Sequence, residues 1–267
     1  MNQHTLLDNL ASSVSFTFDG QHYDAKTLRL QESETGAVWN HPSGLELTVR
    51  RREFEEYCAA EWILEFSNTG KNELPLLERV CALDLIWQGD PATQYTLHGN
   101  NGSRCVMDDF LPFTESIQAQ QRTFAPIGGR SSDGAFSFWN FQSENSGLIL
   151  ALGWSGQWSA TFQRTDEGLH LQASQETLRV KLLPGETIRS PRVLLLKWDG
   201  QDASVGDNAL RRLLLNEYCQ REANGEIALP PISHMTMSQY HLTGWTSEEK
   251  ELDALQRAHD LGCNAFW

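Results

Sequence analysis

The segment GLHLQASQETLRVKLLPGE, residues 168–186, shows the pattern that decides the fold class. Apolar and polar residues alternate along it in two runs, which a short polar stretch separates. The alternating apolar residues are Leu169, Leu171, Ala173, Leu178, Val180 and Leu182. Because successive side chains of a β-strand point to opposite faces, each run would turn one apolar face toward a core. Pro184 and Gly185 then supply a turn, so the segment predicts two half-buried strands followed by a turn.

The same pattern extends over most of the chain, from about residue 14 to residue 200. Short runs rich in β-branched and aromatic residues, such as EWILEFSNTG and RVLLLKW, follow one another. The turn signals between such runs include Asp19-Gly20, Asn68-Thr69-Gly70 and Asp133-Gly134. So many strands without a helical period predict that residues 1–200 form one large antiparallel β-sandwich with almost no helix.

The character of the sequence changes after residue 200. The segment ASVGDNALRRLLLNEYCQ, residues 203–220, carries an apolar stripe at helical spacing. The segment that follows contains Gly225 and Pro230-Pro231, which interrupt regular structure. We therefore assign residues 201–231 to a helix and a linker.

Residues 232–267 are predicted to form a strand, a helix and a second strand. The segment ISHMTMSQ precedes a helix that Thr246 and Glu249 open as a capping box and that Gly262 ends. The apolar segment CNAFW follows. A strand, helix and strand in this order form a βαβ unit, from which parallel sheets are built. A (β/α)₈ barrel needs about 250 residues, so we expect here the first βα unit and the start of strand 2 of a truncated barrel.

The composition limits the classes of partner. The formal charge of −14, from 35 acidic and 21 basic residues, argues against nucleic acid and anionic membranes as partners. The segment MNQHTLLDNLASSVSF has neither a basic region nor a continuous apolar core, so we read no signal peptide. The five cysteines are scattered and never form a C-x-x-C pair. We interpret them as reduced thiols of a cytoplasmic protein.

No motif of the sequence assigns a catalytic residue. The serine segments GGRSSDG and GWSGQW lack the G-x-S-x-G spacing of a nucleophile elbow and lie between predicted strands. The eight histidines show no metal-binding spacing, so we expect no metal and no cofactor. Asp108 and Asp109 are adjacent carboxylates, but neighbouring side chains of extended backbone point to opposite faces. We therefore interpret this pair as capping a turn.

Aromatic residues supply the candidates for substrate binding, because an exposed tryptophan offers a flat apolar face with a polar edge. Most of the nine tryptophans lie within strand patterns and are expected in the core, whereas Trp39, Trp139, Trp158 and Trp245 lie nearer to turns and are the better candidates for the surface. His241 flanks the first strand of the C-terminal segment and can line a pocket. As substrate-binding candidates we take Trp245, His241 and Trp139.

Three longer segments are informative through their order and spacing. They are GLELTVRRREFEEYCAAEWILEFSNTG, then PIGGRSSDGAFSFWNFQSENSGLILALGWSGQW, then LLPGETIRSPRVLLLKWDG with NALRRLLLNEY after it. Together they resemble the N-terminal domain of the melibiase-like α-galactosidases, glycoside hydrolase family 36. The resemblance covers roughly residues 40–267.

The resemblance implies a β-supersandwich akin to that of galactose mutarotase, then a linker helix and a catalytic (β/α)₈ barrel that acts on α-galactosides. It also allows for a homo-oligomer. In the family a sugar-holding Asp-Gly-Trp motif ends the second barrel strand, whereas this sequence ends at Phe266-Trp267. The nucleophile and acid/base aspartates lie farther along and have no counterpart here. We therefore expect an enzyme at the level of the parent polypeptide and an inactive 267-residue chain.

The barrel geometry also predicts the place of the acidic residues in the C-terminal segment. They are Glu248, Glu249, Glu251 and Asp253. A helix that follows a barrel strand packs outside, away from the strand ends at which active sites are built. We expect these four carboxylates to be solvated surface charges.

The segment IGGRSSDG, residues 127–134, is expected to be an ordered connection near the barrel interface and not a catalytic loop. Its two adjacent glycines permit positive φ and a close backbone approach. The five donors of Arg130 can bind carbonyls or a carboxylate across a domain junction. We take Arg130, Ser131 and Ser132 as interdomain residues.

Two other functions stay open. A free-standing mutarotase-like sugar epimerase shares the fold and needs a histidine acid and a carboxylate base in one cleft. His98 or His170 can serve as the acid, but the sequence places no partner carboxylate beside either. A non-catalytic carbohydrate-binding sandwich would instead present Trp39, Trp139 and Trp158 on one surface.

Overall fold

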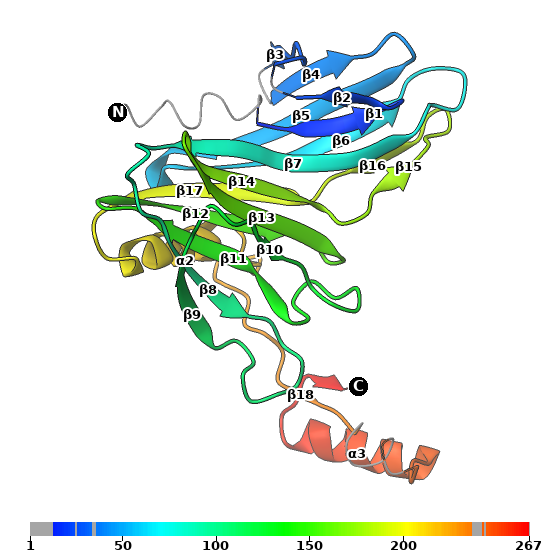
Figure 1. Ribbon diagram of the computed structural model, residues 1–267. Helices are drawn as coiled ribbons and strands as arrows, with labels where there is room; N and C mark the ends of the chain where they lie inside the picture. The colour runs from blue at the N-terminus through cyan, green and yellow to red at the C-terminus, as the bar shows by residue number, and fades with distance from the viewer. Residues whose placement is uncertain (1–12, 25, 34–35, 237–241, 243, 267) are drawn as a thin grey trace. The chain divides into compact units, whose positions relative to one another are not determined.

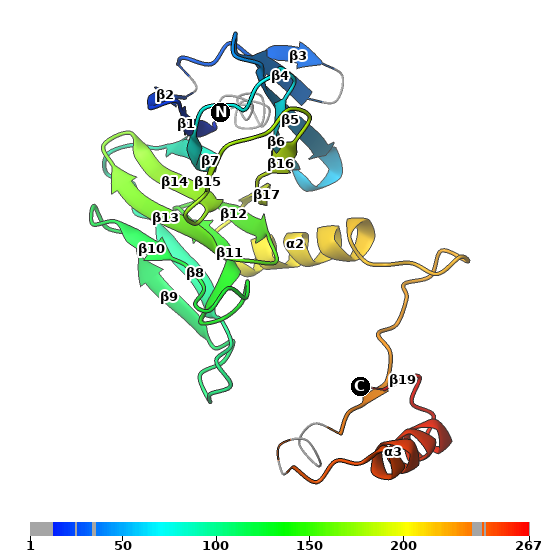
Figure 2. The same ribbon diagram turned by 90° about the vertical axis from the view of Figure 1, so that its right-hand side faces the viewer.

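The computed structural model describes residues 13–24, 26–33, 36–236, 242 and 244–266. The chain divides into two compact units, Met1–Leu213 and Leu214–Trp267. The first unit contains two large β-sheets, and the second contains a short strand–helix–strand segment. Figure 1 and Figure 2 label these elements along the chain.

The first sheet of unit 1 has seven strands and runs from β10 at one edge to β2 at the other. In spatial order its strands are β10 (Arg122–Phe124), β13 (Trp158–Thr165), β14 (Gly168–Gln175), β7 (Leu77–Gln88), β1 (Ser15–Phe18) and β2 (Gln21–Tyr23), with β15 (Arg179–Val180) also pairing with β7. All of its pairings are antiparallel. We call it the seven-stranded sheet.

The second sheet has ten strands and ends at β9. In spatial order they are β3 (Gln31–Ser33), β4 (Gly36–Asn40), β5 (Leu45–Phe54), β6 (Ala59–Asn68), β17 (Arg192–Asp199), β12 (Ser146–Gly153), β11 (Ala135–Gln142), β8 (Thr96–Asn101) and β9 (Pro112–Ser116), with β16 (Thr187–Arg189) also pairing with β6. These pairings are antiparallel too. The last strand of the sheet in sequence, β17, lies between β6 and β12.

The hydrophobic core lies between the two sheets, which face each other in Figure 2. Its largest fully buried side chains include Trp62, Trp139 and Trp158. The indole N–H of Trp62 donates to the carbonyl oxygen of Ala82 at 2.7 Å, so its one polar atom is satisfied. An antiparallel β-sandwich was predicted from the sequence, and the structure confirms it.

The alternation in residues 168–186 has the predicted effect. Leu169, Leu171 and Ala173 are buried in the core, as β14 turns every second side chain inward. Burial of one such leucine contributes about 1.5–3 kcal/mol. Among the described residues before position 200, the only helix is the three-residue 3₁₀ turn Glu55–Tyr57. The expectation of almost no helix in this part of the chain is confirmed for those residues.

Helix α2 (Ser204–Glu217) begins directly after the sandwich, as the sequence predicts. The indole of Trp198 in β17 lies between two glycines. A Cβ built on Gly147 of β12 would lie 2.0 Å from this ring, and one built on Gly206 of α2 would lie 2.4 Å from it. Asn140 accepts the indole N–H at 2.8 Å and donates its amide hydrogens to Ala203 and Asp207. These contacts fix the first turn of α2 on the ten-stranded sheet.

Unit 2 contains β18 (Ser233–His234), helix α3 (Glu248–Asp260) and β19 (Ala265–Phe266). The two strands pair in parallel, with Ser233 opposite Ala265 and His234 opposite Phe266. Helix α3 buries Ala254 and Ala258. Three larger apolar residues of the predicted stripe are exposed: Leu252, Leu255 and Leu261.

The predicted capping box of α3 is wrong by one residue. Ser247 is the N-cap, and its side chain accepts a hydrogen bond from the backbone N–H of Lys250. The hydroxyl of Thr246 instead donates to Glu251 at 2.8 Å. Gly262 follows the helix with a φ of +82°, as predicted for a helix stop. Neither described helix is long and apolar enough to cross a membrane.

Candidate functional site

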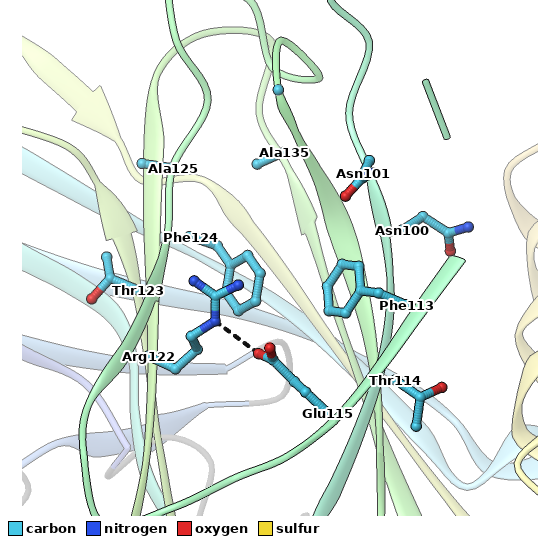
Figure 3. Close-up of a pocket in the computed structure, with 11 residues that line it drawn as sticks. Asn100, Asn101, Phe113, Thr114, Glu115, Arg122, Thr123, Phe124, Ala125 and Ala135 are labelled. Carbon is cyan, nitrogen blue, oxygen red and sulfur yellow. Dashed lines mark hydrogen bonds and ion pairs between the residues drawn. The ribbon is translucent and has the colours of Figure 1, made fainter. Parts of the chain in front are cut away.

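A polar trough opens in unit 1 where the two sheets end side by side. The edge strand of the seven-stranded sheet is β10, and the edge strand of the ten-stranded sheet is β9. The trough has a volume of about 420 Å³ and lies between these strands and the ends of β8 and β11. Figure 3 shows the side chains that line it. We call this feature the edge trough.

Two contacts join the two edge strands across the trough. The Nε of Arg122 in β10 donates to Oε1 of Glu115 in β9 at 2.8 Å. The rings of Phe113 and Phe124 lie nearly parallel, at 12°, with their centroids 5.8 Å apart. The guanidinium of Arg122 also lies over the ring of Phe124, 4.4 Å from its centroid. The trough therefore has an ion pair at one end and an aromatic wall beside it (Figure 3).

The strand periodicity explains why these side chains meet. Residues two apart on a strand share a face, so Phe113 and Glu115 point to one side of β9, and Arg122 and Phe124 to one side of β10. The ring of Phe113 packs on Gly99 of β8, where an added Cβ would lie 2.6 Å from the ring. A larger residue at position 99 would displace that wall.

The rest of the lining consists of Asn100, Asn101, two threonines (Thr114 and Thr123) and the small residues Ala125, Gly134 and Ala135. The amide of Asn101 donates to the carbonyl oxygen of Asp108 at 3.1 Å. That bond sets the orientation of the amide, so its oxygen points into the trough (Figure 3). Ala125 and Ala135 lie at the end away from the ion pair (Figure 3). Within the described residues no group of three His, Cys, Asp or Glu side chains could hold a metal ion.

The loop that borders the trough is ordered by Asp109. Its carboxylate accepts hydrogen bonds from the Ser103 hydroxyl at 2.7 Å and from the backbone N–H groups of Arg104 and Cys105. These bonds, that from Ser103 first, hold the pKa of Asp109 below its ordinary value. The prediction that Asp108 and Asp109 cap a turn is confirmed for Asp109.

Two of the four tryptophans that were candidates for the surface are buried. Trp139 is 2% exposed and Trp158 is fully buried, and their rings pack edge to face with centroids 5.3 Å apart. Both lie on the inward face of their strands, and nearness to a turn does not change that face. A ring buried in this way offers no surface to a sugar, so the substrate-binding candidate Trp139 is a core residue in this structure.

The other two substrate-binding candidates lie in unit 2. Trp245 is 70% exposed, and the ammonium of Lys250 lies 5.7 Å from its ring centroid. Such a ring is accessible to a ligand. His241 lies outside the described residues. Substrate binding by Trp245 and His241 stays a prediction.

The connection at residues 127–134 is ordered, as expected. Gly128 and Gly129 have φ values of +78° and +81°. Arg130 is three-quarters exposed and forms an ion pair with Asp133 at 2.6 Å. The hydrogen bond to Asp133 and the negative charge of that carboxylate raise the pKa of Arg130. Ser131 accepts the indole N–H of Trp158 at 2.9 Å.

Ser132 also takes part in this connection, because its carbonyl oxygen accepts the backbone N–H of Ser103 at 2.7 Å. The loop is thus held to the sandwich by Ser131 and Ser132, while Arg130 faces solvent. An interdomain role for the three residues stays a prediction.

The acidic residues of α3 differ from the expectation at one position. Glu248, Glu249 and Asp253 are exposed, as expected. Glu251 is half-buried, because its carboxylate accepts the hydroxyls of Thr236 at 2.7 Å and Thr246 at 2.8 Å. Glu251 is therefore a structural residue of unit 2 and not a solvated charge.

The structure also gives His170 a carboxylate partner that the sequence does not reveal. Nε2 of His170 lies 2.7 Å from Oδ1 of Asp84, and the Ser15 hydroxyl donates to Oδ2 at 2.6 Å. Burial opposes ionisation of Asp84, but the hydrogen bonds from His170 and Ser15 outweigh it and lower its pKa. A histidine and a carboxylate bonded directly to each other leave no space for a sugar between acid and base.

His98, the other histidine considered for an epimerase, contacts Thr114 and Gln142. It has no carboxylate partner among the described residues. The arrangement of His98 and His170 thus provides no cleft with an opposed acid and base.

Sequence reasoning missed the residues of the edge trough. Phe113-x-Glu115 and Arg122-x-Phe124 each place an aromatic and a charged side chain on one strand face, and this spacing is visible in the sequence. The sequence does not reveal that these two strands are edge strands of the two sheets and lie next to each other. The trough can therefore be recognised only when the order of the strands in both sheets is known.

The comparisons with known proteins concern the fold. No family model and no curated protein matches the sequence. Among solved structures, the α-galactosidase AgaA of Geobacillus stearothermophilus matches with a TM-score of 0.66 and 15% identity, over 95% of this chain and 38% of that one. The galactosidase domain of the α-galactosidase–sucrose kinase AgaSK matches with a TM-score of 0.64 and 14% identity, over the same shares.

A third match is the α-galactosidase of Lactobacillus brevis, with a TM-score of 0.57, 11% identity, and coverage of 95% of this chain and 37% of that one. Structures of AgaA variants have been solved in complex with stachyose and with raffinose. The chain spans little more than a third of the length of the enzymes it matches. It has the fold of the part of these family 36 α-galactosidases that it covers.

Proposed function

We propose that the chain is the N-terminal β-sandwich part of a glycoside hydrolase that acts on α-galactosides. The observation that carries this proposal is the structural match over 95% of the chain to several α-galactosidases. The match includes nearly the whole chain and not the sandwich alone. The sandwich would support a catalytic barrel.

The proposal extends to unit 2, which would be the start of that barrel. Support comes from the parallel pairing of β18 with β19 around α3. Parallel strands joined through a helix are the repeating step of a (β/α)₈ barrel. The exposed Leu252, Leu255 and Leu261 of α3 would then pack against later barrel elements.

We further propose that these 267 residues do not cleave glycosidic bonds by themselves. A retaining glycosidase needs two carboxyl groups about 5–5.5 Å apart that flank the scissile bond. Two of the α3 carboxylates are accounted for within unit 2: Asp253 pairs with Arg257, and Glu251 binds two threonine hydroxyls. The aspartates that attack and protonate the substrate would be supplied by later strands.

A cytoplasmic location and assembly into a homo-oligomer are also proposed. The location is supported by the five free cysteines. In the 267-residue chain alone, where no later barrel element covers them, the exposed leucines of α3 offer an apolar surface through which copies can associate.

The activity is tested with a chromogenic aryl α-galactoside. The 267-residue chain and an extended product of the same gene are purified and compared. We expect turnover by the extended product only, because only it would contain both catalytic carboxylates. The proposal is wrong if the short chain shows turnover that survives repurification and is lost on mutation of a sandwich residue. A gene that encodes no barrel after residue 267 would also contradict it.

A further inference from the structure

The edge trough has the chemistry of a ligand site, and we propose that it binds a neutral saccharide. This goes beyond the proposed function, because it assigns ligand binding to the sandwich itself. Its volume of about 420 Å³ lies within the range of about 300–1,000 Å³ that is usual for small-molecule sites.

The charges of the trough select against ionic ligands. Arg122 and Glu115 form one ion pair, with side chains that are 50% and 35% exposed. An anion attracted by Arg122 would be repelled by Glu115, and a cation attracted by Glu115 would be repelled by Arg122. The formal charge of −14 disfavours an anion further. A neutral ligand is compatible with both members of the pair.

Hydroxyl groups match the hydrogen-bonding groups that the pair leaves unused. The hydrogen bond between them uses Nε of Arg122 and one oxygen of Glu115. The terminal nitrogens of Arg122 and the second oxygen of Glu115 make no hydrogen bond within the described residues. Figure 3 shows both side chains in the lining of the trough. A hydroxyl both donates and accepts. Neighbouring hydroxyls of one sugar could therefore accept from Arg122 and donate to Glu115.

Phe113 and Asn101, which also line the trough, can contact the apolar face and a further hydroxyl group of a sugar. The half-buried ring of Phe113 can contact the apolar C–H face of a pyranose. The oxygen of Asn101, fixed by the bond to Asp108, can accept a further hydroxyl. Because Phe113 packs on Gly99 and Glu115 is bonded to Arg122, the walls are in place before a ligand arrives.

The alternative is that Arg122 and Glu115 only close the open edge of the sandwich. Titration of the 267-residue chain with D-galactose, D-glucose and raffinose, followed by NMR, distinguishes the two roles. We expect saturable binding of at least one sugar with a Kd of about 10 mM or lower. Binding should weaken by about 10-fold or more in Arg122→Met, Glu115→Gln and Phe113→Ala.

A matched control is available in Arg179→Met. Arg179 forms a cross-strand ion pair with Glu78 at 3.0 Å in the same sheet, away from the trough. This variant should bind as the wild type does. If Arg122→Met does not fold, Glu115→Gln and Asn101→Ala decide the matter. Binding should also be unchanged by added sodium chloride, because the ligand is uncharged.

Three outcomes would overturn the proposal: no saturable binding of any of the three sugars by the folded chain, equal binding by the trough variants and the control, or binding of inorganic sulfate that displaces the sugar. The first two would leave the ion pair with a purely structural role. The third would identify an anion site.

Discussion

Asp84 accepts hydrogen bonds from residues that lie 69 and 86 positions away in the sequence. It joins β1, β7 and β14 through its side chain, while its backbone N–H donates to Ser13 at 2.8 Å. Beside it, burial and then the charge of Asp84 raise the pKa of the Cys81 thiol to about 12. Nothing in the local sequence around Asp84 predicts this network, because all of its side-chain partners come from other strands.

The Asp84 network predicts a pH-dependent stability difference. Asp84→Asn should lower the free energy of unfolding at pH 7 by about 1–3 kcal/mol, since a charge-assisted bond to His170 is lost. The folded-state pKa of Asp84 is lowered. Its contribution is therefore fully present above the unfolded pKa of about 3.9 and is lost as the pH falls through the folded pKa.

The measurement is urea denaturation of both proteins at pH 7 and at successively lower pH values. The difference between wild type and variant should shrink as the pH falls below about 4. Asp166→Asn is the control, because Asp166 is exposed in the turn between β13 and β14. A difference that stays constant with pH would show that ionisation of Asp84 does not stabilise the fold.

At the scale of elements, helix α2 can pack closely on the sheet because glycines occupy two positions of the contact. Gly147 and Gly206 leave the space that the indole of Trp198 occupies, and Asn140 holds that indole by a hydrogen bond. Glycine is usually unfavourable inside a helix. Here the close approach of helix and sheet requires it.

Gly206→Ala should therefore destabilise the protein, although alanine favours helix formation by about 1 kcal/mol over glycine. We expect a net loss of about 1–3 kcal/mol from overpacking against Trp198. Asn208→Ala, at an exposed position in the same turn of α2, should change stability by less than about 0.5 kcal/mol. Thermal or urea unfolding of both variants checks this. Stabilisation by Gly206→Ala would mean that the helix and sheet are not packed as described.

The elements themselves were predictable because their signals are local. The alternation around Leu169 and the positive φ at Gly262 follow from the sequence and from backbone geometry. The burial of Trp139 was not predicted, because a turn nearby does not decide which face of the strand a residue occupies. The edge trough was not predicted either, since the neighbours Glu115 and Arg122 come from different sheets, and their meeting depends on the order of all the strands.

At the scale of the whole molecule, the two compact units differ in how well they bury apolar surface. Unit 1 has a continuous core between two sheets. In unit 2 the described buried hydrophobic side chains are those of Ala254 and Ala258. A segment of this size with so little buried apolar surface has little stability of its own.

Limited proteolysis should therefore cut first in the exposed segment at residues 220–231. The product that retains the sandwich and α2 should keep its Tm within about 2–4 °C of that of the intact chain, which corresponds to about 1 kcal/mol. Mass spectrometry of the early fragments and thermal unfolding of the purified product check this. First cleavage within β5 to β17, or a much lower Tm of the product, would contradict the division into units.

The central position of β17 has a consequence for synthesis on the ribosome. Residues 192–199 are the last strand of the ten-stranded sheet to be made, yet they join β6 to β12 in its middle. Until they emerge, the earlier strands of this sheet can form only two separate ribbons, one ending at β6 and one ending at β12, and both of these strands lack the partner that β17 supplies. Such unpaired edges are sites of aggregation, and pairing over long sequence separation is slow. The chain would therefore depend on chaperones most during the interval that ends when Asp199 leaves the exit tunnel.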